Sequence, residues 1–345
     1  QEYRRQGLCM ISPMVFRSLP KGKELPNPYL ERFRDIFAPV TAYLAEYDRH
    51  WFGGSRVERT ALICNETDRA MSGELRWAVT VQGCVSESGS VPADVPAGAI
   101  AEARFSFTAP SVNAPTDGEI QLAWEFGDKR VTRKLPVQFW PRIDLPAPAT
   151  DCLLFDPTGR LAALLAEEGV SVRRIAALSA LPESGARQLI VGPDALHEAQ
   201  QGDAAIVGDW VRQGNTVVTL EQSSLPDRFF PVPLETRGPA SIAFLRAPGH
   251  PLLANLSDFA LRFWTPDARV CEANLAKPIR GGFVPLVDVG GQGMEQSPMV
   301  ELRHGSGRYV VCQLLVGRYA QTVPAARQIL ANILAWQPEP TPLRT

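Results

Sequence analysis

Carboxylates and a histidine follow several of the apolar runs in the second half of the chain. The candidates for chemistry are Asp156, Asp194, Glu221 and His250. Open α/β sheets bind ligands at the carboxyl ends of their parallel strands, so these side chains could meet at one edge. With a nucleophile within hydrogen-bond reach they would form an autonomous hydrolase or an amidotransferase-like enzyme with an atypical site. Each residue also has an ordinary role as a helix cap or a loop residue.

The sequence contains no nucleophile motif. An elbow needs a G-x-S-x-G frame or its cysteine equivalent, because the sharp strand-to-helix turn leaves no room for larger side chains. Ser306 has glycines directly on both sides, which is typical of a hairpin turn, and Cys312 lies in an apolar run that predicts a buried, inert thiol. None of the histidines has metal-ligand or triad spacing: His50, His197, His250 and His304. We therefore expect no catalytic residue and no metal site.

A glycine cluster gives no support for a bound dinucleotide. Gly290, Gly291 and Gly293 follow an apolar strand, but Gln296 stands where the fingerprint has its third glycine. Pro298 prevents the helix whose N-terminus would hold the phosphates. The sequence therefore predicts a loop here and no cofactor.

Two features could concern carbohydrate. Asn65 and Glu66 form the Asn-Glu pair typical of the acid/base carboxylate in barrel glycosidases, but they follow a sandwich strand and no barrel pattern surrounds them. Trp51, Trp140 and Trp264 lie near the ends of elements, where a flat aromatic face could stack on a sugar ring. Four other tryptophans fall on dry faces and are expected in the core: Trp77, Trp124, Trp210 and Trp336.

The hydrophobic periodicity changes along the chain and divides it into three parts. Residues 1–54 are expected to be an extended lead-in and a linker helix over 27–47, which Pro39 would kink. Residues 55–145 alternate with a period of two and predict an antiparallel sandwich of immunoglobulin-like type. Residues 146–345 alternate strands with helices, which predicts an α/β domain. The strands expected in the sandwich are 57–64, 74–81, 101–108, 119–126 and 130–139, with 86–98 as a turn-rich stretch.

In the α/β part, the strand expected over 216–220 is wholly apolar or β-branched, the kind buried on both faces of a parallel sheet. The strands expected there are 152–155, 170–175, 188–191, 216–220, 242–245, 283–289, 298–303 and 308–316. The helices are expected over 160–168, 203–213 and 324–336.

Composition excludes some classes of partner. With 35 basic and 37 acidic side chains the net charge is -2, so no overall field attracts nucleic acid. No apolar run reaches the length of a membrane span. The sequence does not decide whether Cys64 and Cys84 form a disulfide. It therefore does not decide whether the protein is cytoplasmic or exported. Because the chain does not begin with methionine, we expect it to be a piece of something longer.

Two groups of segments resemble known proteins. Residues 25–30, 47–49, 57–60 and 65–67 look like the segment after the catalytic barrel in bacterial family-two β-galactosidases and β-mannosidases. Residues 209–218 and 305–311 are similar to the class I glutamine-amidotransferase-like, flavodoxin-like domain of family-forty-two β-galactosidases. The resemblance implies a parent glycoside hydrolase in which this domain serves assembly rather than chemistry. No catalytic residue carries over, because the barrel and the amidotransferase triad are both missing from this sequence.

Three hypotheses follow. The leading one is a non-catalytic accessory and assembly region of a glycoside hydrolase, with the N-terminal catalytic barrel or a second copy of the chain as its partner. In this hypothesis the apolar stripe of the 27–47 helix would be part of the docking face. The alternatives are a carbohydrate-binding module and an autonomous amidotransferase-like hydrolase.

Overall fold

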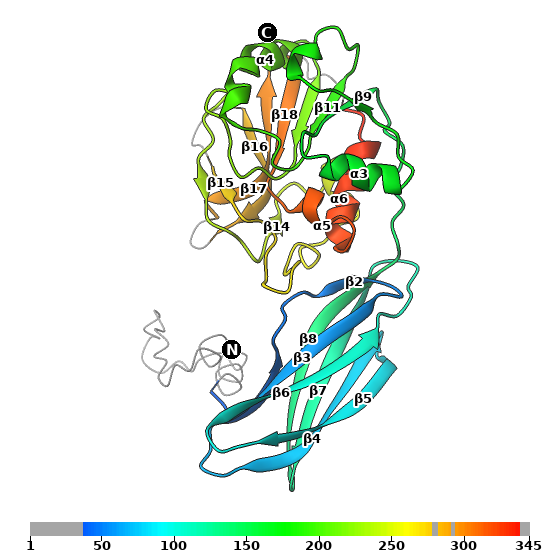
Figure 1. Cartoon of the computed structure of the whole chain (residues 1–345), viewed down its shortest axis with the longest axis vertical. Helices are drawn as coiled ribbons and strands as arrows, with labels where there is room; N and C mark the ends of the chain where they lie inside the picture. Colours follow the sequence, from blue (N-terminus) through cyan, green and yellow to red (C-terminus); the bar gives the residue numbers. More distant parts are fainter. Residues whose placement is uncertain (1–36, 278–281, 291–293, 339–345) are drawn as a thin grey trace, which may run out of the picture. The chain divides into compact units, whose positions relative to one another are not determined.

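The computed structural model describes residues 37–277, 282–290 and 294–338, and most of the regular structure is β-sheet (Figure 1). Contacts between residues divide the chain into two compact units. Apart from two short segments, the first unit ends at Phe139 and the second begins at Trp140. No helix among the described residues is long and apolar enough to cross a membrane.

The first unit is built from two antiparallel sheets. One sheet has the order β1-β3-β6, and the other contains the run β8-β7-β4-β5. Trp77 of β4 stacks on Phe105 of β6 with ring centroids 4.9 Å apart, so the inner faces of the two sheets meet. The strands are β1 (Val40–Leu44), β3 (Arg56–Asn65), β4 (Met71–Val81), β5 (Cys84–Val95), β6 (Ala99–Thr108), β7 (Thr116–Phe126) and β8 (Lys129–Trp140).

Alternation along β4 and β7 places one set of side chains in the core. Leu75 and Val79 on β4, and Ile120 and Trp124 on β7, are each fully buried. Leu75 lies opposite Trp124 across the ladder, and Val79 lies opposite Ile120. The predicted sandwich strands are confirmed here, because a period of two leaves only one face that can be buried.

Two expectations for this unit were wrong. The structure describes only the end of the helix expected over 27–47, and that end is not helical. It forms strand β1, which pairs with β3 from Val40 opposite Asn65 to Leu44 opposite Ala61. Its β-branched residues and its sheet partner outweigh the helical spacing, and residues 27–36 lie outside the described part. The 86–98 stretch is largely strand β5, which pairs with β4 at the sheet edge. Most of its side chains face solvent, so it carries no apolar alternation to reveal it.

The second unit contains a central run of parallel strands in the order β10-β9-β11-β12-β18. These strands are β9 (Cys152–Phe155), β10 (Arg173–Arg174), β11 (Gln188–Val191), β12 (Thr216–Thr219) and β18 (Gly307–Cys312). β10 lies on one side of β9 and the later strands lie on the other. The order therefore reverses between β9 and β11, and this reversal is where such sheets open a crevice for ligands. The strand predicted over 170–175 shrinks to the two residues of β10 at this edge.

Antiparallel strands extend the sheet beyond β18. They are β13 (Thr236–Arg237), β14 (Phe244–Leu245), β15 (Asn274–Ala276), β16 (Phe283–Val289) and β17 (Gln296–His304). His304 pairs with Gly307 at the end of the β17-β18 hairpin, which confirms the predicted turn. The short strand β2 (His50–Phe52) also belongs to this unit.

Helices cover both faces of the parallel strands. One core cluster joins Leu154 and Ile190 of the sheet to α3, α5 and α6, and the other joins Leu153 and Leu189 to α4. Neighbouring residues of one strand thus enter opposite cores, which explains why the strands are apolar throughout. The helices are α3 (Arg160–Glu167), α4 (Ala204–Arg212), α5 (Val316–Tyr319) and α6 (Pro324–Ala335), with 3-10 turns over Leu178–Ala180, Glu198–Asp203 and Pro251–Leu253.

Candidate functional site at the carboxyl ends of the parallel strands

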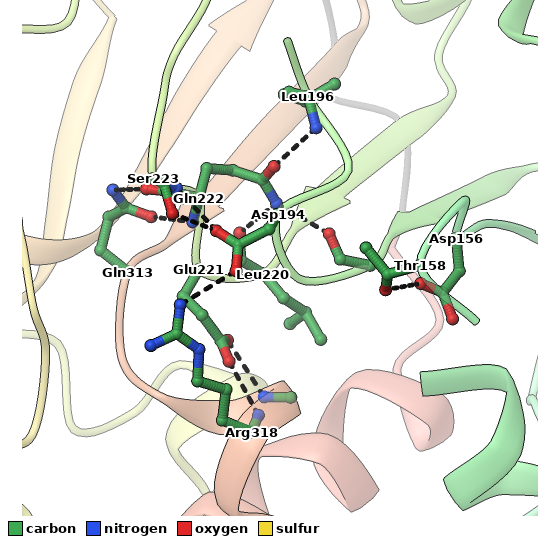
Figure 2. Close-up of polar contacts among 12 residues, drawn as sticks. Asp156, Thr158, Asp194, Leu196, Leu220, Glu221, Gln222, Ser223, Gln313 and Arg318 are labelled. Carbon is green, nitrogen blue, oxygen red and sulfur yellow. Dashed lines mark hydrogen bonds and ion pairs between the residues drawn. The ribbon is translucent and has the colours of Figure 1, made fainter. Parts of the chain in front are cut away.

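The parallel strands bring three of the predicted carboxylates to one edge of the sheet. Asp156 directly follows β9, while Asp194 and Glu221 follow β11 and β12 after short connections. Gln313 directly follows β18. Figure 2 shows Asp194, Glu221 and Gln313 in one polar network with Arg318 of α5, whereas Asp156 lies apart from it and bonds to Thr158. This edge of the sheet is therefore the candidate functional site.

Asp156 holds the beginning of α3. Its Oδ1 accepts a hydrogen bond from Thr158 Oγ1 at 2.8 Å, and its Oδ2 accepts one from the backbone N–H of Ala162 at 2.9 Å. The side chain is buried, and a Cβ added at Gly192 would lie 2.6 Å from Asp156 Oδ1. The carboxylate thus caps a helix and fills the space beside the end of β11.

Asp194 connects the ends of β11 and β12 to α5. Its Oδ1 accepts hydrogen bonds from the Ser223 backbone N–H at 2.9 Å and from Ser223 Oγ at 2.5 Å, and its Oδ2 accepts one from Arg318 at 2.9 Å. Burial opposes ionisation, but the bonds from Ser223 and Arg318 outweigh it and hold the pKa of Asp194 below its usual value. The residue has a positive φ of 51°, a conformation that aspartate tolerates better than most residues.

Glu221, close to the ion pair of Asp194 with Arg318, holds the beginning of α5. Its two carboxylate oxygens accept hydrogen bonds from the backbone N–H groups of Gly317 at 3.0 Å and Arg318 at 2.8 Å. The side chain is buried, and burial raises its pKa to about 7. Position 317 must be glycine, because a Cβ there would lie 2.1 Å from Pro193 Cγ.

Two glutamine amides join the loops. Gln222 Oε1 accepts a hydrogen bond from the Leu196 N–H at 2.8 Å, and its Nε2 donates to the carbonyl oxygens of Gly192 and Leu220, both at 2.8 Å. Gln313 Oε1 accepts from the Gln222 N–H at 2.7 Å, and Gln313 Nε2 donates to the Gln222 carbonyl at 3.1 Å. Both amides are buried and use their donors and acceptors on the backbone.

The polar groups of this network bond to one another and to the backbone. Ser223 is the nucleophile candidate, but its hydroxyl donates to the Asp194 carboxylate, whose low pKa makes it a poor general base. The hydrogen bonds of these residues within the described part of the chain include none to a histidine. The carboxylates that a substrate would need are already bound to helix N–H groups, a serine and an arginine.

His250 does not join this edge, so the expectation that it lies with the other three was wrong. Its Nε2 lies 3.4 Å from Glu301 Oε2 on β17, next to Arg308 near the start of β18. That position is toward the amino end of β18, away from Gln313. Sequence reasoning also missed Ser223, Gln313 and Arg318. Gln313 could have been found as the polar residue that ends an apolar run, whereas Arg318 has no local signal.

The three tryptophans considered for sugar stacking are all buried. Trp51 donates its indole N–H to Asp48 Oδ2 at 2.9 Å, and Trp264 donates to the Ala260 carbonyl at 2.7 Å. Trp140 is among the largest fully buried side chains. A stacking platform needs an open ring face, so the structure lends this prediction no support. The tryptophans predicted in the core are buried as expected: Trp77, Trp124, Trp210 and Trp336.

The remaining sequence candidates have structural roles. Asn65 is fully buried and anchors a turn by donating to the carbonyl oxygens of Arg69 and Val95. Cys64 and Cys84 do not form a disulfide. The Cys312 thiol is buried, and burial raises its pKa, so it is inert as predicted. Among the described residues, no cluster of histidine, cysteine or carboxylate side chains has the arrangement of a metal site.

Comparisons with known proteins add little about function. Residues 156–281 match a domain of unknown function, DUF4350. No curated protein matches the chain. The chain has a weak likeness to a sporulation control protein from Bacillus subtilis, with a TM-score of 0.26, 10% identity and 31% of this chain covered. The match spans 51% of that protein, about half its length.

Two further solved structures are similar at the same level. A cycloisomaltooligosaccharide glucanotransferase from Paenibacillus sp. matches with a TM-score of 0.25 and 11% identity, over 44% of this chain and 19% of the other. A transglutaminase from red sea bream matches with a TM-score of 0.27 and 9% identity, over 38% and 21%. Scores of this size carry no argument about the fold or the activity of this chain.

Proposed function

We propose that the chain is a non-catalytic accessory and assembly region of a larger glycoside hydrolase. In this proposal the first unit is an immunoglobulin-like sandwich, and the second is a flavodoxin-like α/β domain related to glutamine amidotransferases. The sequence resemblance to the barrel-following segments of β-galactosidases supports the parent activity. Its partner would be the catalytic barrel or a second copy of the chain.

One observation carries the non-catalytic part of the proposal. At the edge where doubly wound sheets bind their ligands, Asp156 and Glu221 are buried and bound to the first turns of α3 and α5. Removing either carboxylate from its helix to act on a substrate would leave buried N–H groups without partners. An edge that stabilises the fold in this way is poorly suited to chemistry.

The structure gives less support to the two alternative functions, an autonomous hydrolase and a carbohydrate-binding module. An autonomous hydrolase needs a nucleophile, a base and an orienting group, and Ser223 has only a carboxylate of lowered pKa beside it. A carbohydrate-binding module that used Trp51, Trp140 and Trp264 would need those rings exposed, and they are buried.

Two assays test the proposal. The purified chain is incubated with nitrophenyl glycosides and with glutamine, and we expect no turnover of either. The complete product of the gene, with whatever it encodes upstream, is expected to hydrolyse a glycoside. Its kcat should not change in the Asp194→Asn and Ser223→Ala variants. Turnover by the chain alone that either substitution abolishes would overturn the proposal, as would a complete gene product without glycosidase activity.

A further inference from the structure

The second unit contains a cavity of about 840 Å³ that lies apart from the strand-end network. It is lined by the β16 and β17 strands, the turn over Pro251–Leu253 and the end of α6. Its volume falls in the range typical of small-molecule sites. The wall combines apolar side chains such as Val284 and Leu286 with a group of polar and aromatic residues.

A buried carboxylate organises the polar part of the cavity. Glu301 is 4% exposed, and its Oε2 accepts a hydrogen bond from Arg308 at 3.2 Å and lies 3.4 Å from His250 Nε2. Its Oε1 lies 3.7 Å from Arg303 Nε. Burial opposes ionisation of Glu301, but His250 and Arg308 outweigh it and hold its pKa below the usual value. The cluster is therefore built around a charged carboxylate.

His250 is held in one orientation and has no nitrogen left for acid-base chemistry. Its Nδ1 accepts a hydrogen bond from the Leu252 backbone N–H at 3.2 Å. This assigns the proton to Nε2, which faces Glu301. Both ring nitrogens are thus used within the protein, so the cluster is suited to binding rather than to catalysis.

The cavity carries an excess of positive charge beside its apolar wall. Among the residues that line it, Arg303 and Arg308 are the guanidinium groups and Glu301 is the carboxylate. Arg303 is the more exposed arginine, with 52% of its side chain accessible. Trp336 lies edge-on to the His250 ring, with centroids 5.5 Å apart, and the Arg308 guanidinium lies 5.8 Å from the Trp336 ring. Paired guanidiniums beside apolar side chains favour a ligand that has an anionic group and a ring with a partly apolar face.

We propose that this cavity binds a small ring-shaped polar molecule that carries an oxyanion, as a sugar acid or a sugar phosphate does. Arg303 would contact the oxyanion, and Arg308 would be kept in place by Glu301. The ring would lie against the apolar wall. This site goes beyond the proposed function and does not depend on it.

Calorimetric titration of the purified chain at low ionic strength tests the proposal. The probes are glucuronate, glucose 6-phosphate, glucose and inorganic phosphate. We expect one or both sugar anions to bind, and glucose and inorganic phosphate to bind at least about tenfold more weakly. Which sugar anion binds more tightly identifies the oxyanion as carboxylate or phosphate.

The variant Arg303→Gln removes the exposed charge and is expected to weaken sugar-anion binding about tenfold, the effect of losing one charged hydrogen bond. The matched control is Arg237→Gln, an exposed arginine that is ion-paired with Glu235 outside the cavity. It should bind as tightly as the unmodified chain.

Binding of neither sugar anion, or equal affinity for glucose, would overturn the proposal. So would equal affinity for inorganic phosphate, or an Arg303→Gln variant that binds normally while its circular dichroism spectrum shows a normal fold. None of these results bears on the glycosidase assays, so failure of this site and failure of the proposed function are distinguishable.

Discussion

Glu221 should make the stability of the second unit depend on pH in an unusual direction. Its pKa is about 7 in the folded protein, against 4.5 for an ordinary glutamate. The folded state therefore holds the proton more tightly than the unfolded state does. Its contribution to the free energy of unfolding is fully present below pH 4.5 and is lost as the pH rises through 7. Most buried carboxylates that are ion-paired act in the opposite direction.

The size of the effect follows from the two pKa values. They differ by about 2.5 pH units, and at 1.36 kcal/mol per unit this corresponds to roughly 3 kcal/mol. Glu221→Gln removes the titration. The glutamine keeps one oxygen for one of the two backbone N–H groups on α5, but its NH₂ faces the other. At pH 5 we therefore expect the variant to be less stable by about 1 to 2 kcal/mol. At pH 8 it should be as stable as the unmodified chain or more so.

Urea unfolding between pH 4.5 and 8, followed in the transition of the second unit, measures this difference. The control is Glu235→Gln, which removes an exposed carboxylate from the same unit. It should follow the unmodified chain at every pH. If Glu221→Gln kept the same pH dependence as the unmodified chain, the assignment of a protonated, buried Glu221 would be wrong.

Three further variants test the packing. Arg327 is buried and forms a bidentate pair with Glu168, with N···O distances of 3.1 and 2.6 Å, so Arg327→Met should lower the free energy of unfolding by about 3 kcal/mol in urea titrations. Gly307→Ala would place a Cβ 2.1 Å from the Val211 carbonyl oxygen, and we expect little soluble protein, measured by expression yield. Cys84 is exposed, so peptide mass spectrometry after brief alkylation should find it modified, and the Cys84→Ser variant should lose that adduct without a change in stability. Normal yield for Gly307→Ala or an unmodified Cys84 would contradict the packing described.

Much of the fold could be predicted from periodicity. The strands expected over 188–191 and 283–289 are confirmed residue for residue as β11 and β16, because continuous apolar and β-branched runs between turns have few other solutions. Strand β1 could not be predicted, since its pairing with β3 is a tertiary contact that overrides local spacing. β5 was missed because it lies at a sheet edge and needs no apolar face.

The candidate site could also be predicted only in part. Asp156, Asp194 and Glu221 were placed at one edge because polar residues that end parallel strands must meet there. The capping role of Asp156 is local and was one of the alternatives, because its partners Thr158 and Ala162 are near in sequence. The role of Glu221 could not be predicted, because it bonds to backbone groups of Gly317 and Arg318, almost a hundred residues further along the chain. His250 was misplaced for the same reason, since its partner Glu301 is also distant in sequence.

The pairing of β12 with β18 affects how this chain can fold while it is being synthesised. Thr216 pairs with Arg308, so all the residues between them must be synthesised and leave the ribosome before β18 can pair with β12. Until then β12, whose four residues are all buried in the finished protein, remains an open edge of the nascent sheet. Pairings this distant form slowly. We expect newly made chains to be vulnerable to aggregation during this interval, and a chaperone that shields exposed strands to improve their yield.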